Sequence, residues 1–113
     1  MVKISILYPN KADSRFDMDY YLNTHMPMSI ERLSAAAGFV GVTVEEGISG
    51  AEPGSAPEYT AMCDYMFESL EAFMAAFLPH AELLQGDIIN YTDATPVIQV
   101  NSVKIIKSSQ VPT

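Results

Sequence analysis

Apolar and polar residues alternate in four segments of the chain, and this alternation predicts four β-strands. In the first, residues 2–8 (VKISILY), one face carries the apolar side chains Val2, Ile4, Ile6 and Tyr8. The same spacing predicts strands over residues 39–48 (FVGVTVEEGI), 58–67 (EYTAMCDYMF) and 97–106 (VIQVNSVKII). Within residues 39–48 we expect one face to carry Val40, Val42 and Val44. A four-stranded sheet is therefore the predicted framework.

The segment between the first two strands predicts a helix. Asp17 can cap its N-terminus, and the helix runs through His25. Pro27 disfavours helical geometry at Met26, which predicts a kink or a break there. Because proline suits the first turn of a helix, we expect a continuing helix (PMSIERLSAAAG) that ends at Gly38.

A second helix is predicted between the third and fourth strands. Ser69 is a suitable N-cap for the segment LEAFMAAFL, and Pro79 ends it. Four apolar residues at helical spacing predict one buried stripe, formed by Leu70, Phe73, Met74 and Phe77. The order of elements is then β-α-β-β-α-β, which predicts an α+β, ferredoxin-like fold with an antiparallel sheet.

The two predicted helices cover only one face of this sheet. The other face carries Leu7, Met62 and Met66 among polar residues, which is too much apolar surface to leave wet. A second copy of the chain would cover it, so we expect a homodimer in which two sheets pack face to face. Such a pair makes a dimeric α+β barrel that encloses a cavity between the sheets.

Length and charge narrow the functional classes. With 113 residues, the chain forms a single domain, residues 1–113. A net charge of −8 and the lack of a basic patch argue against nucleic acid and against an anionic membrane surface. The first strand is too short and polar for a signal sequence, and no apolar run approaches the roughly 20 residues of a spanning helix. We therefore expect a soluble, cytoplasmic protein.

Candidate chemistry centres on His25 in the stretch FDMDYYLNTHMPM. Tyr21 lies four residues earlier, so the two rings share a helix face. With an ordinary pKa of about 6.5, His25 is suited to general acid–base chemistry at a pocket edge. Alternatively, it holds the interrupted helix by bonding to a backbone carbonyl. Asp64 or Asp93 could raise its basicity if either lies nearby.

Other residue types add less. His25 and His80 are 55 positions apart without a nearby second ligand, so we predict no metal site. Cys63 alternates with apolar residues and is expected to be a buried packing residue. Met62 and Met66 are candidates for the apolar wall of a ligand cavity. No G-x-G-x-x-G motif follows a strand, so we predict no nicotinamide or flavin cofactor.

Several stretches together resemble the EthD family: LYP at residues 7–9, FDMDYYLNTHMPM at 16–28, NYTD at 90–93 and PVIQVNSV at 96–103. The resemblance spans essentially the whole chain. It implies a dimeric α+β barrel similar to small monooxygenases and muconolactone isomerases, and a partner from a monooxygenase system. Members of the family are often labelled reductases. The resemblance also favours Tyr91, within NYTD, as a substrate-binding residue.

These observations predict a small enzyme that acts on an apolar, oxygenated intermediate of a degradative or secondary-metabolite pathway. Its chemistry would be isomerisation, cyclisation, dehydration or reduction with an external donor. His25 would move the proton, Tyr21 and Tyr91 would orient oxygen atoms, and the Met62 and Met66 face would supply the apolar wall. The alternatives are a non-catalytic carrier for a monooxygenase system, or a structural dimer whose cavity is filled by side chains.

Overall fold

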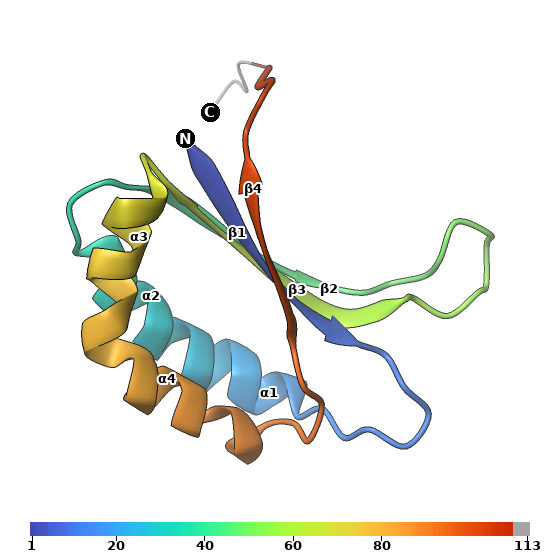
Figure 1. The fold of residues 1–113 in the computed structure, drawn as a ribbon. Helices are drawn as coiled ribbons and strands as arrows, with labels where there is room; N and C mark the ends of the chain where they lie inside the picture. The colour runs from blue at the N-terminus through green and yellow to red at the C-terminus, as the bar shows by residue number, and fades with distance from the viewer. Residues whose placement is uncertain (110–113) are drawn as a thin grey trace.

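A computed structural model describes residues 1–109 as a four-stranded antiparallel sheet with helices on one face (Figure 1). The strands are β1 (Val2–Pro9), β2 (Phe39–Glu46), β3 (Tyr59–Phe67) and β4 (Val97–Ser102). They lie in the order β2-β3-β1-β4, so the helical crossover after β1 leaves a gap that β3 fills. This is the predicted ferredoxin-like fold.

The helical segments form two groups on the same side of the sheet (Figure 1). The first contains α1 (Met18–Tyr20), a π-helical turn (Tyr21–His25) and α2 (Met26–Ser34). The second contains α3 (Leu70–Phe77), a 3₁₀ turn (Leu78–His80), α4 (Ala81–Gly86) and a second 3₁₀ turn (Ile88–Asn90). The side chains of Asp17 and Ser69 accept hydrogen bonds from Tyr20 N and Ala72 N, which confirms both predicted caps.

The first helix does not break before Pro27. Met26 keeps helical geometry, and its N–H bonds to the carbonyl of Tyr21, five residues earlier. This wider π turn accommodates Pro27, which has no N–H to donate. The predicted break is therefore wrong, and the interruption before Pro27 takes the form of a π turn. The helix ends at Ser34, before the predicted end at Gly38. Gly38 has a φ of +87°, and a Cβ atom at this position would lie only 2.7 Å from the Ala72 side chain, so a larger residue does not fit.

The register of β2 differs from the prediction at its start. Phe39 pairs with Phe67, but Gly41 pairs with Met66, so Val40 is an extra residue at a bulge. The bulge turns Val40 away from the core, where it is 49% exposed, while Val42 and Val44 pack against the core as predicted.

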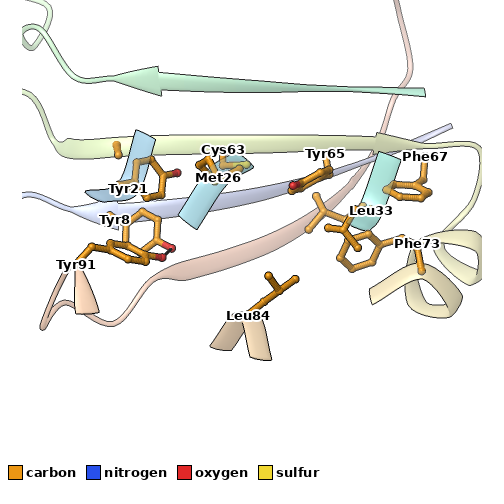
Figure 2. Close-up of a cluster of buried hydrophobic side chains, with 13 residues drawn as sticks. Tyr8, Tyr21, Met26, Leu33, Cys63, Tyr65, Phe67, Phe73, Leu84 and Tyr91 are labelled. Carbon is orange, nitrogen blue, oxygen red and sulfur yellow. Dashed lines mark hydrogen bonds between the residues drawn. The ribbon is translucent and has the colours of Figure 1, made fainter. Parts of the chain in front are cut away.

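The buried core lies between the sheet and the helices (Figure 2). Tyr8 and Tyr91 are at one end of this cluster, while Tyr65, Phe67 and Phe73 are toward the other. Cys63 is buried between them and free, as expected. On α3, small alanines share the buried face with Phe73, so Met74 is 38% exposed and the predicted four-residue stripe is only partly right.

The sheet's other face has no helix over it (Figure 1). Its side chains form cross-strand rows, because antiparallel pairing places partners opposite one another. One row is apolar in its centre and consists of Glu45, Met62, Leu7 and Val97. The next row is polar and consists of Thr43, Asp64, Ser5 and Gln99.

No helix within residues 1–109 has the length and apolar character to cross a membrane.

Candidate functional site

A cavity of about 70 Å³ lies between the sheet and the helices. Its polar lining comes from β1, the π turn, α2, β3 and α4, and consists of Tyr8, His25, Ser29, Tyr65 and Gln85. The rest of the lining is apolar, including Ile98, which is 58% exposed. Since both Gln85 and Ile98 are exposed, the cavity opens between α4 and β4. A few apolar atoms fit inside, and a larger ligand would extend through this mouth.

A wider depression of about 390 Å³ lies over loops at the end of β1 and before β4. Its charged lining residues, Lys11, Asp13 and Asp93, are all exposed. None of the predicted site residues lines it. The smaller cavity is the better candidate for chemistry because it holds buried polar groups in an apolar setting.

His25 is held in the cavity wall by Asp87. The Nδ1 atom of His25 lies 2.9 Å from Oδ2 of Asp87, and the two side chains are only 8% and 12% exposed. An ionised carboxylate can only accept hydrogen bonds, so Nδ1 carries the proton of a neutral imidazole. The other ring nitrogen, Nε2, is then unprotonated and carries the basic lone pair. This pairing fixes both the tautomer and the ring orientation.

Asp87 is itself held by two further donors. The hydroxyl of Tyr20 donates to its Oδ1 at 2.7 Å, and Nδ2 of Asn90 donates to the same oxygen at 2.9 Å. Partial burial alone would raise the pKa of Asp87, but hydrogen bonds from Asn90, Tyr20 and His25 outweigh it and lower that pKa. Asp87 therefore stays ionised at neutral pH.

Burial decides the charge of His25. Removal from water disfavours the imidazolium and lowers the pKa of His25, and the hydrogen bond and negative charge of Asp87 oppose this only in part. His25 is therefore neutral at pH 7. A neutral imidazole with its proton fixed on Nδ1 is the form that can accept a proton at Nε2.

Two tyrosine hydroxyls stand beside this base. The oxygens of Tyr8 and Tyr91 are 2.5 Å apart, and their rings lie next to each other in Figure 2. The hydroxyl oxygen of Tyr91 is 3.4 Å from Nε2 of His25. This is longer than the usual 2.7–3.2 Å, so the lone pair of Nε2 is only weakly engaged. Burial raises the pKa of Tyr8 to about 12 and also raises that of Tyr91, which keeps both phenols protonated as donors.

Similarity to solved structures identifies the family. No protein-family model matches the chain, and a search of curated proteins gives no match either. An EthD-like protein from Ralstonia eutropha JMP134 is 42% identical over 95% of each chain, with a TM-score of 0.83. The chain belongs to the EthD family.

More distant structures share the fold of this EthD chain. An ethyl tert-butyl ether D (EthD) family protein from Bacillus halodurans C-125 is 19% identical, with 92% of this chain and 99% of that chain covered and a TM-score of 0.69. SnoaB from Streptomyces nogalater, a cofactor-independent oxygenase, is 14% identical over 93% of each chain, with a TM-score of 0.56. At these identities the likeness concerns the fold alone.

The EthD chain brings some of the predicted site residues together. His25 lines the cavity, and Tyr91 lies behind Tyr8, outside the lining. Tyr21 packs on His25 with ring centroids 6.0 Å apart, but Tyr21 does not line the cavity, and its hydroxyl is buried without a hydrogen-bond partner in the described part of the chain. A role of these tyrosines in binding stays a prediction.

Met62 and Met66 lie on the opposite face of the sheet from His25. Met62 pairs with Leu7, whose neighbours Ile6 and Tyr8 point to the cavity side. The predicted cavity between two sheets therefore differs from the observed one, which lies between a sheet and its own helices. The methionines cannot line that cavity, so any ligand contact by them would be at a separate place.

Sequence reasoning missed Asp87, and it did not select Tyr8 as a site residue. Asp64 accepts a hydrogen bond from Ser5 on the open face, and Asp93 accepts one from the backbone of Arg15, so neither carboxylate orients His25. Asp87 is 62 positions from His25, and only its place four residues before Tyr91 hinted at a shared site. The described residues contain no group of three or more His, Cys, Asp or Glu side chains suited to a metal ion.

Proposed function

We propose that this EthD chain is an enzyme that transfers a proton on a small, apolar, oxygenated molecule, with His25 as the general base. The observation that carries the proposal is the neutral imidazole fixed by Asp87, on a histidine that lines an apolar cavity and whose Nε2 is 3.4 Å from the Tyr91 hydroxyl. A base with a pKa below its ordinary value stays unprotonated at neutral pH and is available for reaction.

The groups around the cavity suggest a division of roles. Nε2 of His25 removes a proton from a carbon next to a carbonyl, and the electron pair moves toward the carbonyl oxygen. The Tyr91 hydroxyl donates a hydrogen bond to the Tyr8 oxygen, and the Tyr8 hydroxyl donates a hydrogen bond to the carbonyl oxygen as negative charge develops there. The imidazolium then returns the proton to another carbon or oxygen. Such a cycle gives isomerisation, cyclisation or dehydration without an electron donor, whereas a reduction would need one from outside.

The assembly of the chain is a second part of the proposal. We propose a homodimer that forms through the open face of the sheet, as in a dimeric α+β barrel. Its support is the row of Met62, Leu7 and Val97 on a face without a helix, with Val97 47% exposed. A cytoplasmic location and a monooxygenase partner, both expected from the sequence, stay predictions.

Deuterium exchange tests the proton transfer without knowledge of the natural substrate. The probe is para-hydroxyacetophenone in D₂O, whose methyl protons next to the carbonyl exchange when a base removes them. We expect the protein to accelerate this exchange and His25→Gln to lose the acceleration by roughly 10²- to 10⁴-fold. NMR follows the loss of the methyl proton signal.

His80→Gln is the matched control, since His80 lies outside the cavity and is the only other histidine. It should exchange the probe as fast as the unchanged protein. Equal rates for His25→Gln and the unchanged protein would contradict the proposal. Binding of the probe without faster exchange would instead favour the carrier function.

A further inference from the structure

We infer that Ser29 and Tyr65 form a second substrate-binding position in the cavity, which binds a second oxygen atom of the ligand. This inference rests on the proposed function, because it assumes that the ligand's reacting carbonyl lies at Tyr8 and His25. It adds a selectivity that the first position does not supply: the ligand must carry a further hydroxyl or carbonyl group.

The two hydroxyls come from opposite walls of the cavity. Ser29 is on α2 and Tyr65 is on β3, and both side chains line the cavity. Their oxygens are 2.6 Å apart, and the two residues are only 5% and 1% exposed. Bulk water therefore does not reach this pair, and only a molecule inside the cavity can contact it.

The hydrogen bond between Ser29 and Tyr65 leaves one of their two hydroxyl protons without an acceptor. Two hydroxyls have two protons, and the bond between them uses one. Among residues 1–109 neither hydroxyl has a second partner. Burial raises the pKa of Tyr65, although the bond with Ser29 opposes this, so the phenol keeps its proton. A buried donor without an acceptor destabilises the free protein, and a ligand oxygen that accepts its hydrogen bond would remove this cost.

The spacing of the two positions defines the ligand class. Ser29 lies four residues after His25 on the same helical face, so their Cβ atoms are about 5–6 Å apart. The cavity wall between the positions is apolar and includes Ile6, which pairs with Cys63. The ligand is thus an aryl or cyclic ketone whose second oxygen lies about one ring away from the reacting carbonyl. Because the cavity measures only about 70 Å³, part of that ring extends through the mouth between α4 and β4.

A pair of equal-sized probes isolates the second oxygen. Para-hydroxyacetophenone has it, and para-methylacetophenone carries a methyl group in its place. Titrations of the full chain followed by ¹H–¹⁵N NMR give a Kd for each probe. We expect Tyr65→Phe and Ser29→Ala each to raise the Kd of para-hydroxyacetophenone by roughly 2- to 10-fold. The Kd of para-methylacetophenone should change by less than about twofold.

Two further variants serve as references. Tyr59→Phe removes a hydroxyl from the same strand outside the cavity and should change neither Kd. Tyr8→Phe should raise the Kd of both probes by a similar factor, because both carry the acetyl oxygen. Both references are conservative and report on folding through their own NMR spectra.

The outcomes separate the two proposals. If both probes bind and Tyr8→Phe weakens both, but Tyr65→Phe and Ser29→Ala do not distinguish them, the second position is refuted while the proposed function stands. If neither probe perturbs the resonances of His25 and Tyr65 up to its solubility limit, both proposals fail. A selective loss of para-hydroxyacetophenone in both variants supports the second position.

Discussion

The two faces of the same sheet differ in how they treat polar groups. On the helix-covered face, His25 and the side chains of Tyr8 and Tyr65 are buried and line an apolar cavity. On the open face, Asp64 is also buried, but Ser5 donates a hydrogen bond to it at 2.5 Å, and Asp64 lines neither of the two cavities described above. Buried polar groups next to space can act on a ligand, whereas those that only satisfy each other stabilise or specify structure.

The largest difference between the faces should appear in packing. Tyr91 is fully buried among the rings of Tyr8, Phe16 and Tyr21, with centroids 5.1–5.8 Å away. We expect Tyr91→Ala to lower the free energy of unfolding by about 3–5 kcal/mol in urea titrations. The half-buried Met66→Ala on the open face should cost about 1 kcal/mol. Equal losses would contradict the described asymmetry.

A charge on the open face tests whether a second copy covers it. Met62→Lys places a lysine opposite Glu45, so the free energy of unfolding of the monomer should change by no more than about 0.5 kcal/mol. We expect native mass spectrometry to show a dimer for the unchanged protein and a monomer for the variant. Binding of para-hydroxyacetophenone in the cavity should be unchanged, because Met62 lies on the other face. A dimer that survives Met62→Lys would place the interface elsewhere.

The pH dependence of stability should report on the helix-covered face. His25 has a lower pKa in the folded chain than its ordinary 6.5, so below about pH 6.5 the unfolded chain binds more protons. The free energy of unfolding should therefore be constant above this pH and fall as the pH drops toward the folded-state pKa. Asp87, with a lowered pKa, loses its contribution only below its ordinary 3.8, outside this window.

Urea titrations at about pH 7.5 and about pH 5.5 measure this effect. His25→Gln should remove most of the fall, while His80→Gln should retain it. A fall of equal size in both variants would show that His25 is not the group responsible.

The smallest effect is expected at Tyr21. Its hydroxyl is buried without a hydrogen-bond partner among residues 1–109, so removal of the oxygen relieves an unsatisfied group. Tyr21→Phe should leave the free energy of unfolding unchanged or raise it by up to about 1 kcal/mol in urea titrations. A loss above about 1 kcal/mol would show that the hydroxyl has a partner.

The sequence predicted where the four strands lie because alternation directly reflects which side chains are buried. It placed the ends of two strands too late, since β2 ends at Glu46 and β4 at Ser102 rather than at residues 48 and 106. Tyr8 and Ile4 face the core as their spacing indicated, and Cys63 is buried. Val40 was misplaced because a bulge shifts the register at Gly41, and no periodicity records a bulge. The π turn was missed because the sequence shows where Pro27 perturbs a helix but not how the backbone adapts.

The candidate site was less predictable than the fold. His25 was found because few residue types transfer protons near neutral pH. Its partner Asp87 was not, because the contact joins two helical groups that only the folded chain brings together. Met62 and Met66 were assigned to the site because their face was apolar, but the cavity lies on the other side of the sheet.

The protonation of the His25 ring tests the central claim most directly. Long-range ¹H–¹⁵N NMR at pH 7 distinguishes the two neutral tautomers and the imidazolium, and His80 serves as an internal reference. We expect His25 to be neutral, with its proton on Nδ1 and Nε2 unprotonated. A charged ring, or a neutral ring with its proton on Nε2, would contradict the account, because His25 could then not act as a base toward the cavity.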